Sequence, residues 1–572
     1  MSKKTTKQEQ IKDASQGLRG TISAGLDEIA TGAIAEDDQY LVRFHGTYLQ
    51  DDRDVRGERT KKRLEKAYSF MIRVRIPGGV VTPAQWLALD GIASDYANGT
   101  LRLTTRQTFQ YHGVIKSNMR RTMQAIDAAL FDTLAACGDV NRNVLATCNP
   151  HLSSAHAEAL DLARKLSEHL LPKTGAYHEI WLDRERVDPP KFDSASEAEP
   201  IYGKHYLPRK FKTVVAVPPY NDVDIFAQDL GFIAIVEEGS VIGYNVTVGG
   251  GMGMTHGEPD TFPRTADVLG FCTPAQAVDV GEKILTVQRD WGNREVRKHA
   301  RLKYTIEARG LDAFRSEVET RLGFRLGTPR PFAFNSTSDP LGWSKGADGK
   351  WHLGLFVENG RIKDSPEHPL RTALREIARV HKGEMICTAN QNVIIAGATE
   401  AVKKKIDTIL GAHGISIATS SGLRRNSMAC VALPTCALAL AESERFLPEL
   451  VTALEDSIER AGLRADDIVI RMTGCPNGCA RPYLAEIGLV GRGPGLYNLY
   501  LGAAFNGSRL NKLYAQDVDK ARIVALLDPL LLSYAKDRKH GERFGDFVVR
   551  VGVVKATTTG RQFHAEVQPV SA

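Results

Sequence analysis

Four cysteines near the C-terminal end of the chain have the spacing of a metal-binding set. Cys430 and Cys436 are separated by five residues, Cys475 and Cys479 by three, and 38 residues lie between the two pairs. Thiolates gathered in this way suit a soft metal centre, and an iron–sulfur cluster is usually held by four cysteines. The spacing therefore favours an iron–sulfur cluster and, with it, a redox enzyme.

Two other interpretations of these cysteines stay open at this point. Structural zinc sites favour cysteines separated by two to four residues, for which five is wide. Disulfides need an oxidising compartment, but residues 1–8 contain no apolar stretch typical of a secretory signal. We therefore expect a cytoplasmic protein. The remaining cysteines are scattered, and we interpret them as structural thiols: Cys137, Cys148, Cys272 and Cys387.

The composition excludes several classes of protein. The chain has 572 residues, of which 42% are hydrophobic and 25% charged, as in ordinary globular proteins. No apolar stretch of about 18 residues is present, so we expect no membrane span. A formal charge of +6 is too mild to indicate a nucleic-acid partner. It suits a small anionic substrate or an acidic partner.

The sequence contains an internal repeat. Gly99–Gly113 aligns with Gly383–Gly397 at a constant offset of 284 residues, which matches Gln107 with Gln391. Each copy follows an amphipathic helix, the first with Thr82 as its N-cap, and a strand precedes each helix, at 69–75 and 352–358. Each unit therefore reads as strand–helix–strand–turn–strand, an α+β half-module.

A second repeated block follows each half-module, at residues 233–249 and 487–502. The fold class is therefore an internally duplicated α+β fold, with two half-modules and two larger α/β modules related by a pseudo-two-fold axis. A site is expected between the halves, because clefts form at domain interfaces. We divide the chain into an N-terminal segment, the first half-module, the first larger module, the second half-module and the second larger module: 1–62, 63–150, 151–325, 326–415 and 416–572.

Basic residues lie where strands and turns would present them to a ligand. Lys210 and Lys212 are two residues apart, on one face of an extended segment that enters the apolar run 213–217. A buried cation needs an anion, which an anionic cofactor or substrate would supply. Other arginines lie in similar strand and turn positions: Arg73, Arg102, Arg106 and Arg142.

These motifs together resemble the sirohaem- and 4Fe-4S-containing sulfite and nitrite reductases. The resemblance covers residues 18–555 and rests on the cysteine pairs, on Thr-Thr-Arg-Gln-Thr-Phe-Gln at 104–110 and on Pro-Arg-Lys-Phe-Lys at 208–212. Residues 44–54 and 289–294 are most similar to the assimilatory, NADPH-dependent branch. The resemblance implies ferredoxin-like half-modules around a central cofactor site.

The resemblance also implies how the cofactors are held. The four cysteines would bind the 4Fe-4S cluster, and Cys479 would in addition ligate the sirohaem iron, so that one sulfur joins both centres. Arginine suits the carboxylates of sirohaem. The residues around the macrocycle would be Arg102, Arg106, Gln110, Arg209, Arg301, Gln391 and Asn477. Family members often carry Asn where this chain has Thr105.

On the other face of the macrocycle, the resemblance places the catalytic set around the bound anion: Arg73, Arg142, Lys210 and Lys212. The implied reaction is the six-electron reduction of sulfite to sulfide. Cations offset the charge of the dianion. A lysine whose pKa is lowered by nearby positive charge can also donate a proton, whereas arginine cannot do so readily. His112 on its strand is more typical of a structural histidine.

Electrons are expected to come from another protein. The glycine-rich segment 249–253 follows a strand but opens no helix with an acidic partner, so NADPH binding is not predicted. The resemblance implies a flavoprotein subunit carrying FAD and FMN, and we expect the N-terminal segment to dock it. The first alternative is a ferredoxin-dependent sulfite or nitrite reductase of the same fold, and within it Lys212 favours sulfite over nitrite. The second is a zinc-stapled structural or nucleic-acid-binding protein.

Overall fold

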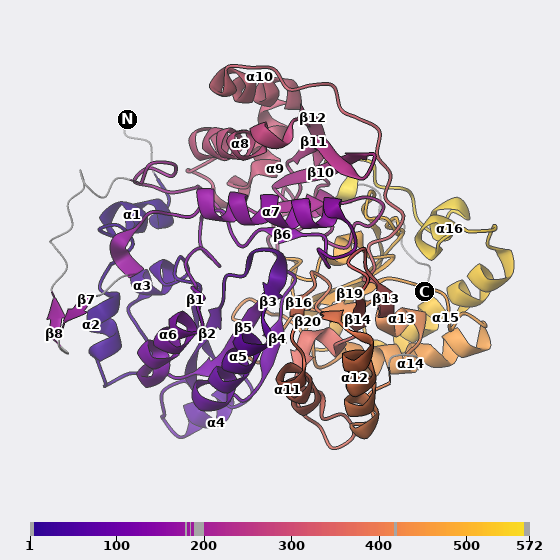
Figure 1. Cartoon of the computed structure of the whole chain (residues 1–572), viewed down its shortest axis with the longest axis horizontal. Helices are drawn as coiled ribbons and strands as arrows, with labels where there is room; N and C mark the ends of the chain where they lie inside the picture. Colours follow the sequence, from indigo (N-terminus) through magenta and orange to yellow (C-terminus); the bar gives the residue numbers. More distant parts are fainter. Residues whose placement is uncertain (1–4, 178–179, 183–184, 188–198, 417–419, 565–572) are drawn as a thin grey trace.

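Two antiparallel five-stranded sheets form the half-modules. The computed structural model describes residues 5–177, 180–182, 185–187, 199–416 and 420–564 (Figure 1). The first sheet has the order β1-β2-β5-β4-β15 and the second β13-β14-β17-β16-β3. The strands of the first sheet are β1 (Thr47–Asp51), β2 (Tyr68–Arg73), β5 (Phe109–Val114), β4 (Leu101–Leu103) and β15 (Arg361–Ile362). Those of the second are β13 (Gly342–Lys345), β14 (Trp351–Leu355), β17 (Val393–Ala398), β16 (Glu384–Cys387) and β3 (Val80–Val81).

The two sheets exchange their short edge strands. β15 comes from the second half of the chain and pairs with β4, while β3 comes from the first half and pairs with β16. The half-modules also share one hydrophobic core, in which Phe70 and Tyr111 of the first pack with Leu353 and Ile395 of the second. The half-modules are therefore one folding unit.

Helices cover these sheets at the predicted places. α5 (Pro83–Tyr96) begins after Thr82, whose side chain accepts a hydrogen bond from the Gln85 amide in a capping box. Its buried face includes Trp86 and Leu89. The corresponding helix of the second half is α11 (Leu370–Val380), which packs against α5. The remaining helices of the half-modules are α6 (Met119–Ala128) and α12 (Glu400–Ala412).

The repeated turn has the same hydrogen bonds in both halves. The Thr104 amide donates to the Thr108 carbonyl, and the amide of its counterpart Thr388 donates to Asn392, both at 2.9 Å. Gln107 and Gln391 have positive φ angles of 51° and 71°. The alignment at offset 284 is thus a repeat of backbone structure.

The two larger modules share one sheet topology. Their strand orders are β12-β11-β10-β9-β6 and β18-β19-β20-β21-β22, each with three parallel strands followed by two antiparallel ones. The first set is β6 (Leu145–Ala146), β9 (Thr213–Ala216), β10 (Leu230–Glu237), β11 (Ser240–Val248) and β12 (Asp267–Cys272). The second is β18 (Ser427–Ala429), β19 (Ile470–Thr473), β20 (Ile487–Gly493), β21 (Leu496–Leu501) and β22 (Lys512–Val518).

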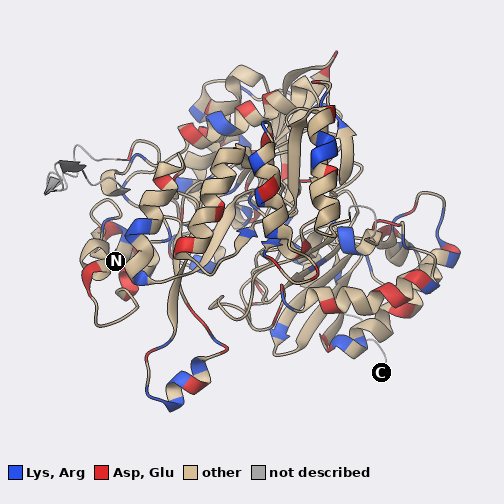
Figure 2. Ribbon diagram, turned by 60° about the horizontal axis from the view of Figure 1, so that its bottom comes forward, with Lys and Arg blue, Asp and Glu red and all other residues tan. Residues whose placement is uncertain are grey.

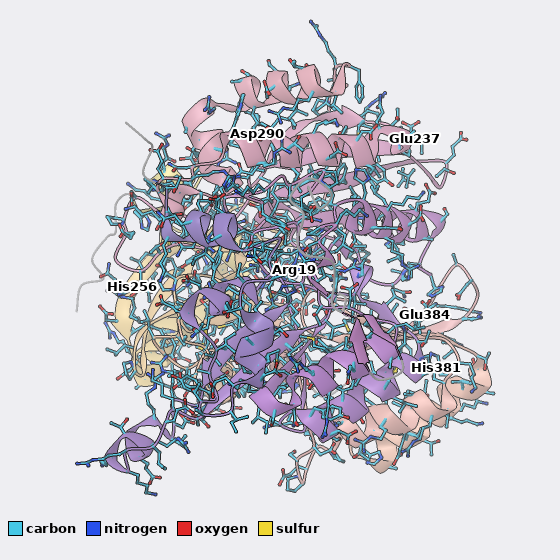
Figure 3. All side chains as sticks on the ribbon, turned by 90° about the vertical axis from the view of Figure 1, so that its left-hand side faces the viewer. Arg19, Glu237, His256, Asp290, His381 and Glu384 are labelled. Carbon is cyan, nitrogen blue, oxygen red and sulfur yellow. The ribbon has the colours of Figure 1, made fainter. Side chains whose placement is uncertain are left out.

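Each larger module has its own hydrophobic core and its own helices. The first carries α7 (Ser154–His169), α8 (Ala277–Trp291), α9 (Leu302–Arg309) and α10 (Leu311–Leu322). The second carries α13 (Gly422–Arg425), α14 (Leu447–Arg460), α15 (Lys520–Asp537) and α16 (Phe544–Arg550). Seen from the side, Asp290 and Glu237 mark the first larger module, while His381 and Glu384 mark the second half-module (Figure 3).

The N-terminal segment is built into the fold. Its helices are α1 (Lys7–Ala14), α2 (Ile22–Asp27) and α3 (Glu36–Leu41). Ile11 and Leu18 join the core of the first larger module, and β1 pairs with β2. Residues 1–4 and 565–572, which the predicted boundaries include, lie outside the described residues. The described helices include none that is long and apolar enough to cross a bilayer.

A basic arm projects between β1 and β2. It comprises residues 53–66, contains α4 (Arg56–Lys61), and extends away from the body of the protein (Figure 2). Its tip exposes Lys61, Lys62, Arg63 and Leu64. At its base, Nη1 of Arg53 donates to the carbonyls of two residues of the cysteine-containing loop, Cys436 and Ala439, at 3.3 and 2.7 Å.

Candidate active site and metal centre

The parallel strands of the second larger module position the four cysteines. Cys430 directly follows β18, and Cys475 comes two residues after β19. Because β18 and β19 are parallel, their carboxyl ends meet at one edge of the sheet. The loops are tied together there, since the Gly474 amide donates to the Cys430 sulfur at 3.4 Å. The sheet therefore brings both halves of the cysteine motif to one place.

The four sulfur atoms influence one another electrostatically. The pKa of the Cys436 thiol is raised to about 11, mainly by burial and also by Cys479 and Cys475. Burial and Cys479 also raise the pKa of Cys430 and of Cys475. Asn477 lies within the same loop and its Nδ2 donates to the Cys475 sulfur at 3.5 Å. A bound cation would offset this mutual repulsion of thiolates.

The spacing of the sulfurs fits a cluster better than a single zinc ion. Four thiolates around one zinc, at about 2.3 Å each, would lie about 3.8 Å apart. Within the described residues, one group of three or more Cys, His, Asp or Glu brings its ligand atoms within 4.8 Å of one another, and it contains none of these four cysteines. In a four-iron cluster each sulfur binds a different iron, so the sulfurs stand further apart.

The lysine pair lies on the side of this centre and has no carboxylate partner among the described residues. The pKa of Lys210 is lowered to about 7, mainly by burial and also by the charges of Arg209, Arg142 and Arg301, while Cys479 acts in the opposite direction. Lys210 therefore lies within electrostatic range of Cys479. Neither ammonium group forms a hydrogen bond or ion pair with another described residue, and both side chains are half-buried. Such a pocket needs an anionic ligand.

Burial and neighbouring cations also affect the second lysine of the pair, Lys212. Burial lowers the pKa of Lys212 well below its usual range, and Arg106, Arg301 and Lys210 lower it further. Arg106 lies in the turn after β4, where Nη1 donates to Gln228 Oε1 at 2.9 Å. Its Nε has no partner among the described residues, although it is buried. This unpaired Nε–H donor is a second indication that the pocket binds an anion.

Two further members of the predicted anion-binding set are Arg73, at the end of β2, and Arg142, shortly before β6. Nη1 of Arg73, at the end of β2, lies 2.8 Å from the Cys137 sulfur. Gln110 is its partner in β5, and with the amide oxygen turned toward Arg73 it accepts from Nη2 at 2.5 Å. Nε of Arg142 donates to the Gly138 carbonyl at 3.2 Å.

Arg209 and Arg301 differ in their partners. Nε and Nη2 of Arg301 donate to both carboxylate oxygens of Asp229, at 3.1 and 2.7 Å. Arg209 has no hydrogen-bond partner among the described residues, and burial together with Arg297 lowers its pKa to about 10. Arg209 is therefore free to bind a carboxylate, whereas Arg301 already has one.

Arg102 and Gln391 lie behind the cysteine loop. Nε of Arg102, within β4, donates to Glu444 at 2.8 Å, and its Nη2 donates to the Ala429 carbonyl at 2.8 Å. Nε2 of Gln391 donates to the same carbonyl at 3.0 Å, while its buried oxygen has no partner among the described residues. Both residues therefore hold the peptide that precedes Cys430.

The glycine-rich segment 249–253 serves packing. It follows β11 and runs against the cysteine loop, where the Met254 amide donates to the Pro476 carbonyl at 2.9 Å. A Cβ on Gly253 would lie 3.1 Å from the Asn477 carbonyl oxygen, and one on Gly478 would lie 3.1 Å from the Met252 carbonyl oxygen. Glycine thus allows the two loops to approach.

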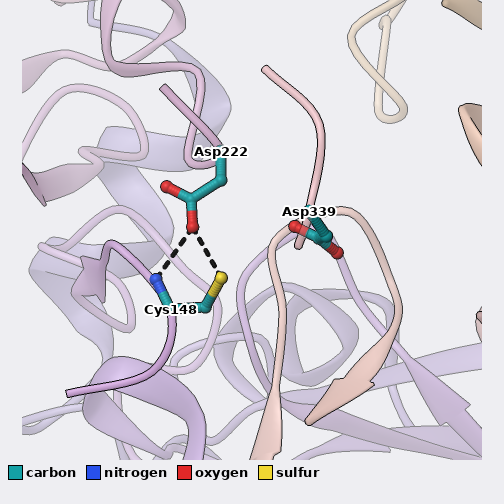
Figure 4. A group of neighbouring side chains, drawn as sticks. All are labelled: Cys148, Asp222 and Asp339. Atoms are coloured by element: carbon teal, nitrogen blue, oxygen red, sulfur yellow. Dashed lines mark hydrogen bonds between the residues drawn. The ribbon is translucent and has the colours of Figure 1, made fainter. Parts of the chain in front are cut away.

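The pseudo-symmetric counterpart of this centre has two aspartates and one cysteine, Asp222, Asp339 and Cys148. Asp222 and Cys479 precede the turns before β10 and β20, respectively, at equivalent positions. Figure 4 shows Asp222 accepting hydrogen bonds from the amide and the sulfur of Cys148, at 2.8 and 2.7 Å. Burial and Asp339 raise the pKa of Asp222 to about 7. A polycarboxylate would be repelled here, so the duplicated halves have diverged.

Several residues near the site were not predicted from the sequence. Cys137, interpreted as a scattered structural thiol, contacts Arg73 and influences the pKa of Tyr48. Thr105 donates through Oγ1 to the Cys479 carbonyl at 3.2 Å. Arg481 follows Cys479 by two residues, and only its closeness in sequence could have marked it. His112 is buried with its pKa lowered by burial to about 3, which fits a structural role.

The lowered pKa of Lys210 predicts a pH dependence of stability for protein produced without its cofactors. Between pH 7 and the ordinary lysine pKa of about 10.4, the unfolded chain binds a proton that the folded chain does not. The free energy of unfolding should therefore rise with pH in this window, and it should rise less in Lys210→Met. Urea midpoints at pH 7 and 9 measure this. An equal rise in both proteins would contradict the account.

The comparisons with known proteins agree with this geometry. A family model described as the nitrite and sulphite reductase 4Fe-4S domain matches residues 162–326, and the nitrite/sulfite reductase ferredoxin-like half domain matches 62–129 and 344–413. The chain belongs to the nitrite and sulfite reductase family. Membership confirms the predicted α+β fold, the oxidoreductase class, and the 4Fe-4S and sirohaem cofactors, while the residue roles stay predictions.

Particular relatives refine the comparison. The chain is 63% identical over 566 residues to the sulfite reductase [NADPH] hemoprotein beta-component of Methylobacterium sp. (strain 4-46), covering 99% of this chain and 93% of the relative. It is 58% identical to the protein of that name from Shouchella clausii, covering 97% of each. The solved structure of the Mycobacterium tuberculosis NirA protein matches with a TM-score of 0.75 at 26% identity, covering 95% of each chain.

Proposed function

We propose that this chain is the cytoplasmic hemoprotein component of an NADPH-dependent assimilatory sulfite reductase, which reduces sulfite to sulfide. The observation that carries the proposal is structural: Cys430 and Cys475 follow the parallel strands β18 and β19, and Lys210, within electrostatic range of Cys479, has no partner among the described residues. The names of the relatives support the same activity.

The residues present fit both cofactors. The four cysteines would hold the cluster, and Cys479 would also ligate the sirohaem iron. Nε of Arg106 is a buried donor without a partner among the described residues, and it would donate to an anionic ligand. The other predicted contacts of the macrocycle carboxylates are Arg102, Gln110, Arg209, Arg301, Gln391 and Asn477. When bound, the two cofactors would pass the six electrons of the reduction from the electron donor to sulfite, which we expect in three two-electron rounds.

The chain's own cations bind the anion and move protons. Arg73 and Arg142 hold sulfite oxygens and offset the charge of the dianion. Lys210, with a pKa of about 7, can donate a proton from Nζ to a departing oxygen near neutral pH and take another from water. Lys212 faces the same cations and has the same capacity.

Turnover with an artificial reductant tests this proposal. Purified holoprotein given reduced methyl viologen should release sulfide from sulfite, with a kcat/KM for sulfite above that for nitrite, because two lysines face the anion. Turnover of nitrite alone would favour the nitrite reductase alternative. Coupling to NADPH through a flavoprotein, compared with coupling to ferredoxin, identifies the electron donor.

The flavoprotein that carries FAD and FMN is proposed to dock at the basic arm. The arm begins beside the loop of Cys436, and Leu438 of that loop is 64% exposed. The base of the arm lies beside the cysteine loop, where electrons must enter, and the exposed cations of its tip would attract an acidic partner to this side of the protein. The arm overlaps the end of the predicted docking region, residues 1–62, and continues beyond it to residue 66.

Charge reversal on the arm provides the test. The triple variant Lys61→Glu, Lys62→Glu, Arg63→Glu should lower flavoprotein-driven turnover about tenfold, because complementary charge speeds encounter. Turnover with methyl viologen should not change. Lys404→Glu with Lys405→Glu, on exposed positions of α12, is the matched control. Unchanged coupling in the arm variant would reject the docking proposal.

A further inference from the structure

A buried ion pair lies on the pseudo-two-fold axis. Asp224 and Arg481 each precede one 3-10 turn, η4 (Ile225–Ala227) and η8 (Pro482–Leu484), and both have positive φ angles, 47° and 55°. These turns lie between the last two parallel strands of each larger module, so the two residues are equivalent. Nε of Arg481 donates to Oδ2 of Asp224. Both side chains are buried, at 3% and 0% exposure.

Arg481 also joins the two half-modules. Its Nη1 donates to the Thr105 carbonyl at 3.2 Å and its Nη2 to the Ala389 carbonyl at 3.0 Å. Thr105 and Ala389 are matched by the 284-residue repeat, in the turns that have identical hydrogen bonds. One guanidinium thus contacts equivalent backbone atoms of both halves, which a lysine ammonium lacks the planar fork to do.

The hydrogen-bond network around Arg481 extends to the backbone of Cys479. Thr105 donates through Oγ1 to the Cys479 carbonyl at 3.2 Å, and the Arg481 amide donates to the Gly478 carbonyl at 2.9 Å. The Cys479 sulfur itself is exposed and makes no hydrogen bond with another described residue. Its direction is therefore set by the backbone on either side, including the left-handed conformation of Arg481, which persists only where its surroundings hold it.

We propose that Arg481, oriented by Asp224, is a positioning residue for Cys479. It fixes the direction of the Cys479 sulfur toward the pocket of Lys210 and Arg106, and so the ligation of the sirohaem iron by that sulfur. The inference rests on the proposed function, in which this sulfur is the shared ligand. The inference gives a positioning role to Arg481 and Asp224, which are outside the predicted catalytic and cofactor-binding residues.

Arg471 offers a matched control. It lies on β19, is buried, and its Nη1 donates to the same oxygen of Asp224 at 2.6 Å. It has no hydrogen bond to Thr105, Ala389 or the cysteine loop among the described residues. If the ion pair served stability alone, Arg471→Lys and Arg481→Lys would have similar consequences.

The test compares the holoenzyme with the variants Arg481→Lys, Arg471→Lys, Thr105→Val and Thr105→Ser. We expect Arg481→Lys to shift the visible absorption bands and the g values of the ferric sirohaem. Its kcat should be at least about tenfold lower, with KM for sulfite within about twofold, since small misplacements cost this much. Thr105→Val should shift the same signals, Thr105→Ser should restore them, and Arg471→Lys should keep the wild-type spectrum.

Other outcomes separate the inference from the proposed function. Spectra and kcat unchanged in Arg481→Lys and Thr105→Val would overturn the inference, as would an equal shift in Arg471→Lys. If Arg481→Lys does not fold, Thr105→Val decides, because it removes only one hydroxyl. Wild-type protein without sirohaem absorption would instead refute the proposed function.

Discussion

Replacing Cys479 by serine is expected to abolish sulfite turnover, with a loss of at least about 10³-fold, the scale of removing an essential group. The serine hydroxyl is a hard, protonated oxygen that binds soft iron poorly. The variant should therefore lose the absorption of bound sirohaem together with the activity, because the same sulfur would serve both centres. The fold should survive, since this side chain is exposed and makes no hydrogen bond with a described residue.

The control for this change is a buried cysteine outside the candidate site. Cys272 in β12 is buried in the core of the first larger module, and Cys272→Ser should keep the iron, the absorption and the turnover. Thermal unfolding of both variants shows whether a loss of activity reflects the site or the fold. Full turnover in Cys479→Ser would contradict the assignment of a shared ligand.

Lys212→Met is expected to have the second largest effect. Methionine fills much of the same space but can neither bind an anion nor give a proton. Both cofactors should stay in place, because the lysine has no role in holding the cysteine loop. We expect kcat with sulfite to fall about 10²- to 10⁴-fold, the usual contribution of a general acid. Steady-state turnover with methyl viologen measures this, after the iron and sirohaem content has been matched.

Lys204→Met is the control for the lysine. It lies eight residues earlier in the chain, and its exposed ammonium forms an ion pair with Asp13 at 2.6 Å. Turnover and cofactor content should be those of the wild type. Normal sulfite turnover in Lys212→Met, with normal haem content, would refute the proposed role of this lysine.

The fold was predictable where the sequence repeats. Gly99–Gly113 and Gly383–Gly397 align because each encodes the same hairpin, and Thr82–Pro83 marks a helix start with a local mechanism. The exchange of β3 and β15 between sheets was not predictable. Strands of two residues carry no periodic pattern, and their pairing depends on the contact between halves.

The site was predictable as residue types and only partly as contacts. Cysteine spacing and the Lys210–Lys212 pair mark a ligand directly. By contrast, Arg102 and Arg301 have carboxylate partners within the protein, Glu444 and Asp229, which lie 342 and 72 residues away. Such pairs arise from the packing of distant segments, so no local pattern shows them. The same holds for Asp224 and Arg481, which only the pseudo-two-fold axis brings together.

Mössbauer spectroscopy of oxidised, iron-57-enriched protein tests the central claim most directly. If one sulfur joins the cluster and the sirohaem iron, about five irons per chain should be present, and all should show magnetic splitting from the haem spin. A cluster without such splitting, beside an independent haem signal, would contradict the shared ligand. An iron-free protein that contains zinc would contradict the whole account.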